Sequence, residues 1–432
     1  MINATAIKAS LVFLFVFLMG GSVFAQDVTA DVNVTKSVAV TENKVATADA
    51  GPAIPEMNYT PSNIQNPFYF VYKGSNTNFT IDSQSLLSKK YYTVNYNRFR
   101  TDIETGWQNK FTFNMILDLN NYWGDSYMRS PDWQLSKAVS FNMPLDPYHD
   151  IVSGNSSTLR SYLYRAYATV YLPSSSLVLG YQRIAFGVGK IWNPTDILNP
   201  PNPISLEPGE RVGVYGASYT YNLADLSQTD LFLTLDRDNK TRDYGFRIKG
   251  NHFGYDAAIS TIRNKDLRMS GLELDRELFD TGIEVRMEAA HFEVVNKLNE
   301  NKDYQKYIMG ADYAFAWPNN WYVTMEYLFN ENGEKNKYEY DLLNAVSGTT
   351  WDGLGQRYLG FLVNYEWSPL INITASEIVN LDDGSYFLSP GVNWSLAENA
   401  DLILGASFFC GTQYSEFWYL KDIYYLNLGI YF

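Results

Sequence analysis

The sequence predicts an all-β fold, a transmembrane up-and-down antiparallel β-barrel of about eighteen strands, with about sixteen as the main alternative. Three observations predict it. Short runs of alternating apolar and polar residues recur from residue 66 to the end of the chain. The last stretch, Asp422 to Phe432, is apolar at every second position. Aromatic residues make up 16% of the chain and charged residues only 19%, which suits a barrel with aromatic girdles at two membrane interfaces.

The alternation is clearest between Lys110 and Asn120. The apolar face of this run consists of Phe111, Phe113, Met115, Leu117 and Leu119. A helix would distribute these residues over both of its faces, whereas a strand places them all on one. Similar rows begin at Leu231, Ile283, Trp321, Leu359 and Leu402. Each row predicts a strand with one apolar face.

The final strand would be an exposed, sticky edge in a soluble protein unless it is paired on both sides. Its apolar row, counted back in twos, is Phe432, Ile430, Leu428, Leu426 and Tyr424. Closure of a barrel supplies two partners, the strand that ends near Phe409 and the first strand, near Phe68. We expect the apolar row to contact lipid, and Asn427 and Gly429 to face water. A terminal Phe of this kind resembles the end of Gram-negative outer-membrane barrels, which use it as an assembly signal.

The start of the chain predicts export. Lys8 precedes the apolar run from Leu11 to Met19, and the small-residue site at Ala25 follows. Residues 1–25 are therefore interpreted as a secretory signal peptide, because the apolar run is short for a membrane anchor. Residues 26–65 lack a sustained period and are expected to form a flexible periplasmic arm. Residues 66–432 are expected to form the barrel.

Connector lengths predict the direction of the strands, because outer-membrane barrels have short periplasmic turns and longer outside loops. The long connectors run from Gly124 to Leu159, from Val188 to Glu210 and from Glu331 to Gln356. Upward strands are then expected to end near Trp123, Gly187, Asp236, Ile262, Phe292, Phe329, Val379 and Phe409. Two weak strands, around Arg268 to Asp275 and Tyr386 to Trp394, distinguish about eighteen strands from about sixteen. An even number places both termini in the periplasm.

Charged residues on the polar faces of the strands are expected to line a wet lumen, because charge is costly toward lipid. They are Lys110, Asp118, Arg165, Arg247, Lys249, Glu284, Arg286, Glu288, Lys306, Asp312, Glu326 and Glu366. Positive and negative members are equally frequent, so the wall predicts neither anion nor cation selectivity. The alternative is a solvated face with no selective role.

The most distinctive segment is the Pro-rich stretch within Tyr181 to Arg211. Prolines 194, 200, 201, 203 and 208 prevent it from continuing a strand ladder and make it stiff. We predict that residues 188–210 form an extracellular loop that narrows the bore. Its polar candidates are Arg183, Lys190, Asn193, Asp196, Asn199, Asn202 and Arg211. The alternative is a structural cap that packs on the rim through Trp192.

Two stretches resemble a known family. The run from Gln182 to Pro200, Q-R-I-A-F-G-x-G-K-x-W-N-P-T-D-x-x-N-P, and the segment R-F-R-T-D-I-E from Arg98 to Glu104 are similar to single-chain outer-membrane porins of the alginate-export-like group. The resemblance implies an eighteen-stranded channel in the outer membrane. That group has a strongly positive lumen, whereas the charges here are balanced, so the resemblance leaves the solute open.

Other function classes are weakly supported. The net charge of -14 argues against nucleic acid as a partner. The three histidines, His149, His252 and His291, accompany no G-x-S-x-G motif, so an enzyme is not expected. No C-x-x-C, H-E-x-x-H or P-loop spacing predicts a metal or cofactor.

The sequence thus predicts a porin for passive diffusion of small polar solutes. The alternative is a closed structural barrel that binds a glycan or a protein through its long loops. The expected partners are outer-membrane lipids, a small polar solute or ion, and the barrel-assembly machinery, which would recognise the terminal strand. The oligomeric state stays open.

Overall fold

A computed structural model describes residues 68–86, 88–138, 141–224, 226–295, 302–316, 319–341, 351 and 353–432. The expected signal peptide and the expected periplasmic arm both lie outside the described residues. Among the described residues, no helix is both long and apolar enough to cross a membrane.

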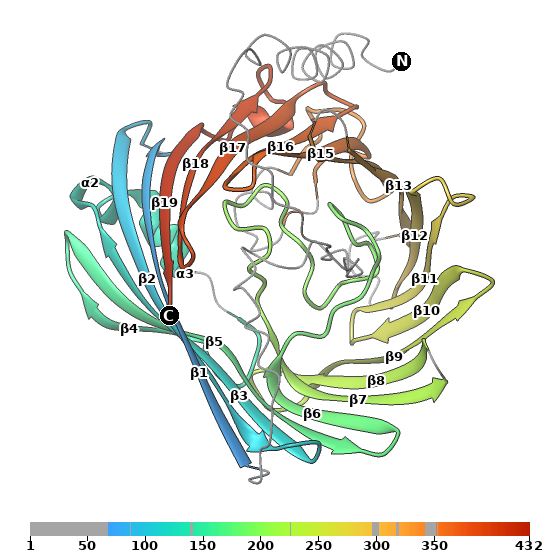
Figure 1. Ribbon diagram of the computed structural model, residues 1–432. Helices are drawn as coiled ribbons and strands as arrows, with labels where there is room; N and C mark the ends of the chain where they lie inside the picture. The colour runs from blue at the N-terminus through green and yellow to red at the C-terminus, as the bar shows by residue number, and fades with distance from the viewer. Residues whose placement is uncertain are drawn as a thin grey trace, which may run out of the picture.

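The described chain is almost entirely β-sheet (Figure 1). Its strands are β1 (Phe68–Gln84), β2 (Tyr91–Trp107), β3 (Phe111–Trp123), β4 (Tyr148–Ser153), β5 (Ser157–Leu172), β6 (Ser175–Gln182), β7 (Val214–Ala224), β8 (Ser227–Leu235), β9 (Thr241–His252), β10 (Tyr255–Arg263), β11 (Leu267–Glu277), β12 (Ile283–Val294), β13 (Tyr304–Phe315), β14 (Trp321–Asn330), β15 (Arg357–Ser368), β16 (Ile371–Asn380), β17 (Tyr386–Ala397), β18 (Ala400–Cys410) and β19 (Ile423–Tyr431). Three short helical segments accompany them, α2 (Asp125–Met128), α3 (Pro131–Ala138) and η1 (Glu416–Trp418).

Each wall strand pairs antiparallel with two neighbours, and β1 pairs with both β2 and β19, so the sheet closes on itself. Eighteen strands form the closed wall, and β4 is a short addition to it. The two weak segments that distinguished about eighteen strands from about sixteen both form wall strands, β11 and β17. The prediction of an all-β barrel with about eighteen strands is confirmed.

The longest connections, which follow β3, β6, β14 and β18, all lie at one end of the barrel, as predicted. We call the ends of the barrel the loop end and the turn end. The upward strands end within two residues of the expected positions, with one exception. The exception is β6, which ends at Gln182 and not near Gly187, because the chain leaves the wall there. Its partner β5 is therefore unpaired above Ala166 on that side, and β4 fills the gap by pairing with residues 158–162 of β5.

The last strand closes the barrel. The backbone of Phe432 exchanges two hydrogen bonds with Gly74 of β1, at 2.6 and 2.9 Å. A Cβ atom on Gly74 would lie 2.2 Å from the Phe432 ring, so only glycine lets this ring cross β1 toward Phe99 of β2, at a centroid distance of 6.0 Å. Leu426 and Ile430 are exposed on the outside, whereas Asn427 is buried. The expected pairing of this strand and the outward orientation of its apolar row are confirmed. Asn427 and Gly429, which were expected to face water, are buried on the opposite face.

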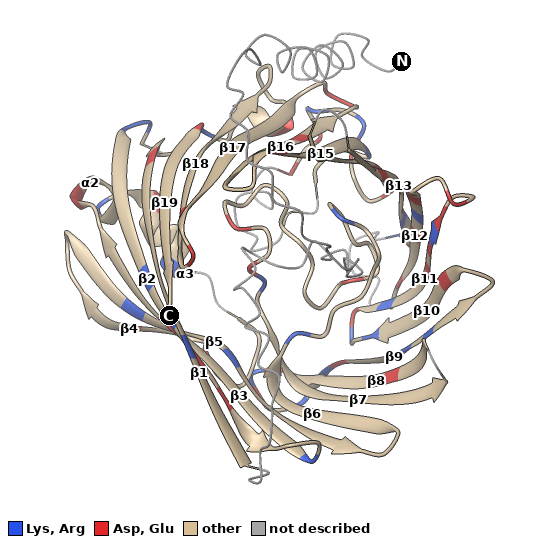
Figure 2. Ribbon diagram, in the orientation of Figure 1, with Lys and Arg blue, Asp and Glu red and all other residues tan. Residues whose placement is uncertain are grey.

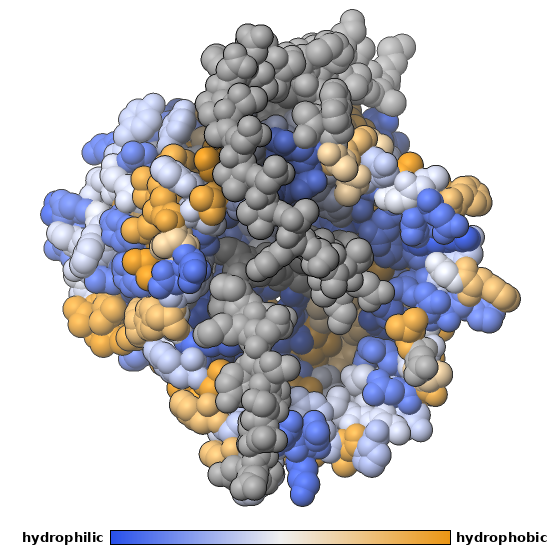
Figure 3. Space-filling model, viewed as in Figure 1, coloured by the Kyte–Doolittle hydropathy of each residue, from blue (hydrophilic) through white to orange (hydrophobic). Residues whose placement is uncertain are grey.

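The distribution of polarity is inverted relative to a soluble protein. Exposed apolar side chains stand on the outer face, including Leu231, Leu233, Ile259, Met309, Met325 and Leu404. The inner face instead buries charged side chains, including Asp118, Glu273, Arg286, Glu288, Asp312 and Glu326. Figure 2 shows charged residues on many of the wall strands, and Figure 3 shows hydrophobic patches among hydrophilic residues at the periphery of the same view. Charge inside and apolar surface outside is the polarity that a membrane barrel requires.

The connection after β3 also packs on the inner face. Met128 of α2 and Trp133 of α3 form a buried cluster with Val94 of β2. Val94 shares its face of β2 with Arg98, whose side chain reaches a segment inside the barrel. The α2–α3 connection therefore partly fills the lumen near the loop end.

Candidate functional site

The segment between β6 and β7, residues 183–213, lies inside the barrel, and we call it the inner loop. Figure 1 shows it in green within the ring of strands. Gln182 of β6 pairs with Val214 of β7, so the loop leaves the wall and returns to it at one place. The predicted loop, residues 188–210, was too short by several residues at each end, because strand alternation continues in the sequence beyond the point where the backbone turns inward.

Two wall carboxylates hold the first part of the inner loop. Glu326 of β14 accepts hydrogen bonds from the backbone N–H groups of Lys190 and Ile191, at 2.6 and 2.9 Å, and from that of Trp192 at 3.2 Å. Glu288 of β12 accepts them from the N–H groups of Val188 and Thr195 and from the Thr195 hydroxyl.

Both carboxylates are fully buried. A Pro-rich segment has no neighbouring strand to accept hydrogen bonds from its buried N–H groups. These two acidic side chains accept those hydrogen bonds instead. Glu288 and Glu326 therefore anchor the loop, and the sequence pattern alone predicted only that they face the lumen.

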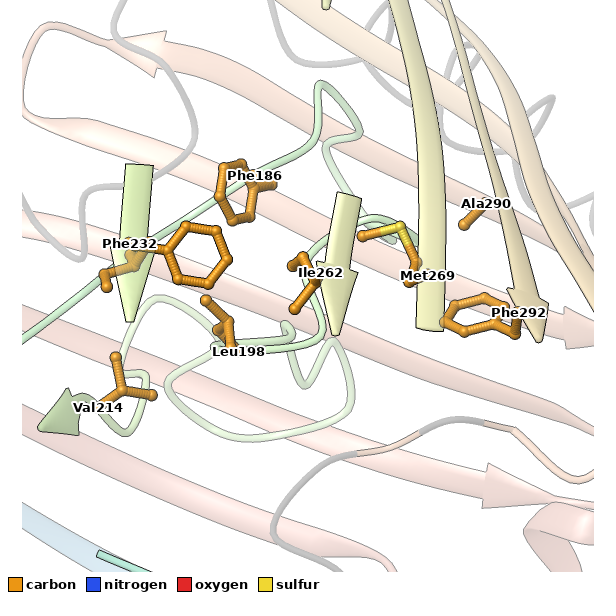
Figure 4. Packing of buried hydrophobic residues seen from close by; sticks show 9 residues of the cluster. Phe186, Leu198, Val214, Phe232, Ile262, Met269, Ala290 and Phe292 are labelled. Carbon is orange, nitrogen blue, oxygen red and sulfur yellow. The ribbon is translucent and has the colours of Figure 1, made fainter. Parts of the chain in front are cut away.

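Apolar packing holds the same part of the loop. Phe186 and Leu198 belong to one buried apolar cluster with Phe232, Ile262 and Phe292, which lie on β8, β10 and β12 (Figure 4). A hydrophobic interior of this size normally excludes water from the contact. The loop is thus attached to this side of the wall by apolar burial as well as by carboxylates.

Trp192 is buried in a second apolar cluster with Ile308 and Tyr358. A Cβ atom on Gly360 of β15 would lie 2.7 Å from the Trp192 ring, so the glycine permits the close approach. The packing role suggested for Trp192 is real, although it packs on the inner wall and not on the rim.

The far part of the inner loop is tied to β2. Arg98 forms a bidentate pair with Glu207, at 2.7 and 3.1 Å. Arg100 contacts Glu210 at 2.8 and 3.1 Å and Asp118 of β3 at 2.7 Å. Such paired contacts fix orientation as well as distance.

Arg98 and Arg100 are part of the motif from Arg98 to Glu104, but their inward orientation was not predicted from the sequence. The apolar Phe99 between them, which faces out, was the signal that could have revealed it.

The two attachments lie on opposite sides of the barrel. Between β2 and β12, eight wall strands lie on one side (β3 and β5 to β11), and eight lie on the other (β13 to β19 and β1). The inner loop therefore crosses the full width of the lumen, from the anchors Glu288 and Glu326 to the arginines of β2.

Burial and ion pairing shift the pKa values of the acidic groups of the inner loop. Burial raises the pKa of Asp196 to about 6, against the hydrogen bond from the Asn199 N–H and the positive charge of Arg211, 3.5 Å away. Burial likewise raises the pKa of Glu207. For Glu210, burial acts in the same direction, but the charge and hydrogen bonds of Arg100 together with the charge of Arg98 and a hydrogen bond with Tyr164 outweigh it and lower the pKa. Glu210 is thus held ionised in its pair with Arg100.

Several other predicted residues stabilise the base of the inner loop. Asn199 accepts a hydrogen bond from the Ile184 N–H at 2.8 Å and donates one to the Val212 carbonyl at 2.5 Å. Arg165 of β5 donates to the Arg211 carbonyl at 2.7 Å. Arg183, which begins the loop, acts together with Arg211 to lower the pKa of Asp196 against the effect of burial. These side chains serve the fold of the loop.

The remaining predicted residues fall into groups along the wall. Arg286 pairs with Asp312 and lies 3.3, 3.7 and 4.0 Å from carboxylate oxygens of Glu284, Glu326 and Asp275. Arg247 pairs with Glu273.

Two predicted residues lie apart from the inner loop. Lys249 lies near the turn end, 3.9 Å from Asp256. Lys110 is in the turn between β2 and β3 and does not line the wall, contrary to the prediction, because β3 begins only at Phe111.

A cavity of about 240 Å³ separates part of the inner loop from the wall. It is lined by Trp192, Asn193, Asp196, Phe292, Lys306 and Trp351, among others. The Lys306 ammonium lies 5.7 Å from the centroid of the Phe292 ring. In the part of the chain that the structure describes, no cluster of three or more His, Cys, Asp or Glu side chains is placed to hold a metal ion.

No protein-family model matches the chain, and no curated protein matches it. Solved structures do match its fold. OccK5 (OpdH) of Pseudomonas aeruginosa is 11% identical, with a TM-score of 0.54 over 84% of this chain and 97% of that one. OccAB3 of Acinetobacter baumannii is 11% identical, with a TM-score of 0.54 over 84% and 99%.

OccK8 (OprE) of P. aeruginosa is 8% identical, with a TM-score of 0.55 over 84% and 98%. A further structure, of OccK2 (OpdF) of P. aeruginosa in complex with glucuronate, is 8% identical, with a TM-score of 0.52 over 84% and 96%. These proteins are outer-membrane porins of the Occ family. At such identities the likeness establishes the fold, and it confirms the expected weak similarity to outer-membrane porin barrels.

Proposed function

We propose that this chain is a channel of the Gram-negative outer membrane through which small polar solutes diffuse passively, and that the inner loop is its constriction. The observation that carries the proposal is the diametric crossing of the lumen by a loop tied to β12 and β14 at one side and to β2 at the other. A segment held in this way narrows the free cross-section of the lumen. The wall itself does not depend on the loop, because its strands are held by their own hydrogen bonds.

The polarity of the wall supports a wet path. Charged side chains on the inner faces are costly in a dry interior unless they are paired or hydrated. Lys249 and Glu284 are both part-exposed on the lumenal side. A small, polar solute is the kind of molecule that such a path admits.

Location and assembly follow from the same proposal. The apolar outer face suits a bilayer, and Gram-negative outer membranes house barrels of this type. Export would use residues 1–25 as a signal peptide, and the terminal strand would be recognised by the barrel-assembly machinery. Neither a cofactor nor a catalytic residue is part of the proposal.

The second candidate is a closed barrel that binds a glycan or a protein through its loops. The inward packing of Met128 and Trp133 favours it, since these residues fill part of the lumen near the loop end. In this alternative the inner loop is a plug, and the aromatic residues at the loop end are contact residues.

Planar-bilayer recording of the purified protein separates the two candidates. The channel predicts steady, ohmic current steps that appear with each inserted molecule. A protein that inserts, as shown by protection of its wall strands from protease in vesicles, and yet carries no current would establish the closed barrel.

A further inference from the structure

Strands β1 and β2 carry a row of polar side chains on the outer face of the barrel. We call Asn76, Asn78, Thr80, Asn95 and Asn97 the polar ladder. Residues paired directly across antiparallel strands point to the same face of the sheet. Asn78 is paired with Leu428 of β19 on one side and Asn97 of β2 on the other, and Thr80 is paired with Leu426. Because Leu426 is exposed on the outer face, the polar ladder faces outward too.

The alternate residues of the same strands confirm this orientation. Phe79 is buried on the inner side and stacks on Tyr96 of β2, at a centroid distance of 5.6 Å. Arg98 of β2 reaches the inner loop from that side.

The polar ladder lies at the height of the apolar belt. Asn76, Asn78 and Thr80 are paired with Ile430, Leu428 and Leu426, the apolar row of the final strand. On one side along the strands lie Phe99 and Phe432, whose rings are 6.0 Å apart. On the other side lie the exposed rings of Tyr91 and Trp123, residues of the kind found in interfacial girdles. The ladder is therefore positioned where a barrel normally presents apolar side chains to lipid.

The ladder satisfies only part of its hydrogen-bonding capacity. Asn76 and Asn97 exchange two amide hydrogen bonds, at 3.3 and 3.2 Å. Asn78 and Asn95 exchange two more, at 3.1 and 2.9 Å, and Asn95 also donates to Thr80 at 3.1 Å.

Each primary amide has two N–H donors. Within the described residues, Asn76, Asn78 and Asn97 use one donor each. An unused amide donor in hydrocarbon is costly, because lipid offers no acceptor.

We propose that the polar ladder is a contact surface for a second copy of this chain, joined by a two-fold axis within the membrane. A two-fold axis presents the same patch from both copies, so the patch must complement itself. Carboxamides meet this requirement because each one is both donor and acceptor and none is charged.

The residues beside the ladder complete the contact. Leu426 and Leu428 of β19 flank it on one side, paired with Thr80 and Asn78. On the other side Trp123 of β3 is paired with Asn95, and Asn121 of β3, paired with Asn97, adds a further amide. Interchain bonds between amides stabilise association in membranes.

Cross-linking tests the contact, and the sequence favours it because Cys410 is the only cysteine. In a Cys410→Ser background, Asn78→Cys treated in outer membranes with a short bismaleimide should give a covalent dimer. The matched control is Leu272→Cys, which is exposed on the outer face of β11. Eight wall strands separate β1 from β11 in each direction. The control should stay monomeric.

The mass of the purified complex provides the second measurement. Light scattering in mild detergent should give a dimer for the native chain. Asn76→Leu combined with Asn78→Leu and Asn97→Leu should weaken dimerisation at least roughly tenfold. The barrel of this variant should remain folded, as shown by heat-dependent mobility on gels. A monomeric native chain, or equal cross-linking at positions 78 and 272, would overturn the proposal, and so would a dimer that persists in the triple variant without cross-linking at position 78.

Discussion

At the scale of single residues, the sequence predicted which side chains face the lumen but not what they do there. Glu288 and Glu326 were expected to line a pore, and they face inward. Their actual partners are backbone N–H groups about a hundred residues or more away in the sequence. Alternation gives the face of a strand, whereas it contains no information on what a loop brings to that face. Arg98 and Arg100 were missed for the same reason.

Removing the Glu326 carboxylate should loosen the inner loop. Glu326→Ala leaves three backbone N–H groups without their acceptor, and a hydrogen bond to a charged group is worth about 1.5–3 kcal/mol. We expect noisier single-channel current and faster protease cleavage within the loop. Glu284→Ala is the control, since Glu284 pairs with Arg286 and has no bond to the inner loop. Equal noise in both variants would show that Glu326 is not an anchor.

The ion pair between Arg98 and Glu207 should hold the far part of the inner loop against β2. Arg98→Glu opposes Glu207 with a like charge and should detach the far part of the inner loop, which raises conductance. Adding Glu207→Arg restores an opposite pair and should return the conductance toward the native value. A double variant that conducts like the single one would mean that the two side chains act independently.

At the scale of elements, the strands were predicted well and the connections poorly. The upward strands end close to the expected residues because the apolar belt imposes a period of two on each. The departure at Gln182 has no such marker, since apolar residues continue through Ile184 and Phe186. These residues are apolar because they pack on the inner wall and not because they face lipid. The β4 strand is a consequence of the same departure and was not predicted.

The connection between β18 and β19 should respond to pH. Burial raises the pKa of Glu416 in η1 to about 7, and the charge of nearby Asp383 adds to this shift. Hydrogen bonds from the Tyr358 hydroxyl, the Leu354 N–H and the Asn380 amide oppose it. A folded-state pKa above the ordinary value contributes stability that is complete below about pH 4.5 and lost as pH rises through about 7. Protease cleavage within residues 411–422 should therefore be faster at pH 8 than at pH 5.5.

Glu416→Gln provides the control for the pH dependence. The amide keeps the size of the side chain and one acceptor, and it does not titrate over this range. Corrected for the activity of the protease on an unfolded peptide, its cleavage rate should be nearly independent of pH. A native chain with a flat profile would contradict the assignment.

At the scale of the whole molecule, composition and alternation were sufficient for the barrel, its closure and the position of its last strand. Composition and alternation did not predict which segments fill the lumen, because contacts between a loop and a distant part of the wall produce no periodic pattern in the sequence. The sequence predicted equal numbers of positive and negative charges on the wall, but the charges around the inner loop are not balanced. Arg98 and Arg100 face Asp118, Glu207 and Glu210, and Arg286 faces four carboxylates.

Carboxylates thus outnumber guanidinium groups at both attachments of the inner loop. We predict a modest preference for cations, measured as the reversal potential across a gradient of potassium chloride. Combining Glu210→Gln with Glu284→Gln should shift the reversal potential toward that of an unselective pore. A native channel that prefers chloride would contradict this reading of the lumen.

If the inner loop limits the bore, its removal should change the single-channel conductance of the barrel. Residues 188–210 are replaced by a short Gly/Ser turn, which leaves the paired bases at Gln182 and Val214 intact. We expect a larger conductance than that of the native chain, from a barrel with unchanged heat-dependent mobility. An unchanged conductance in a correctly folded variant would show that the solute path avoids the inner loop and that this loop is not the constriction.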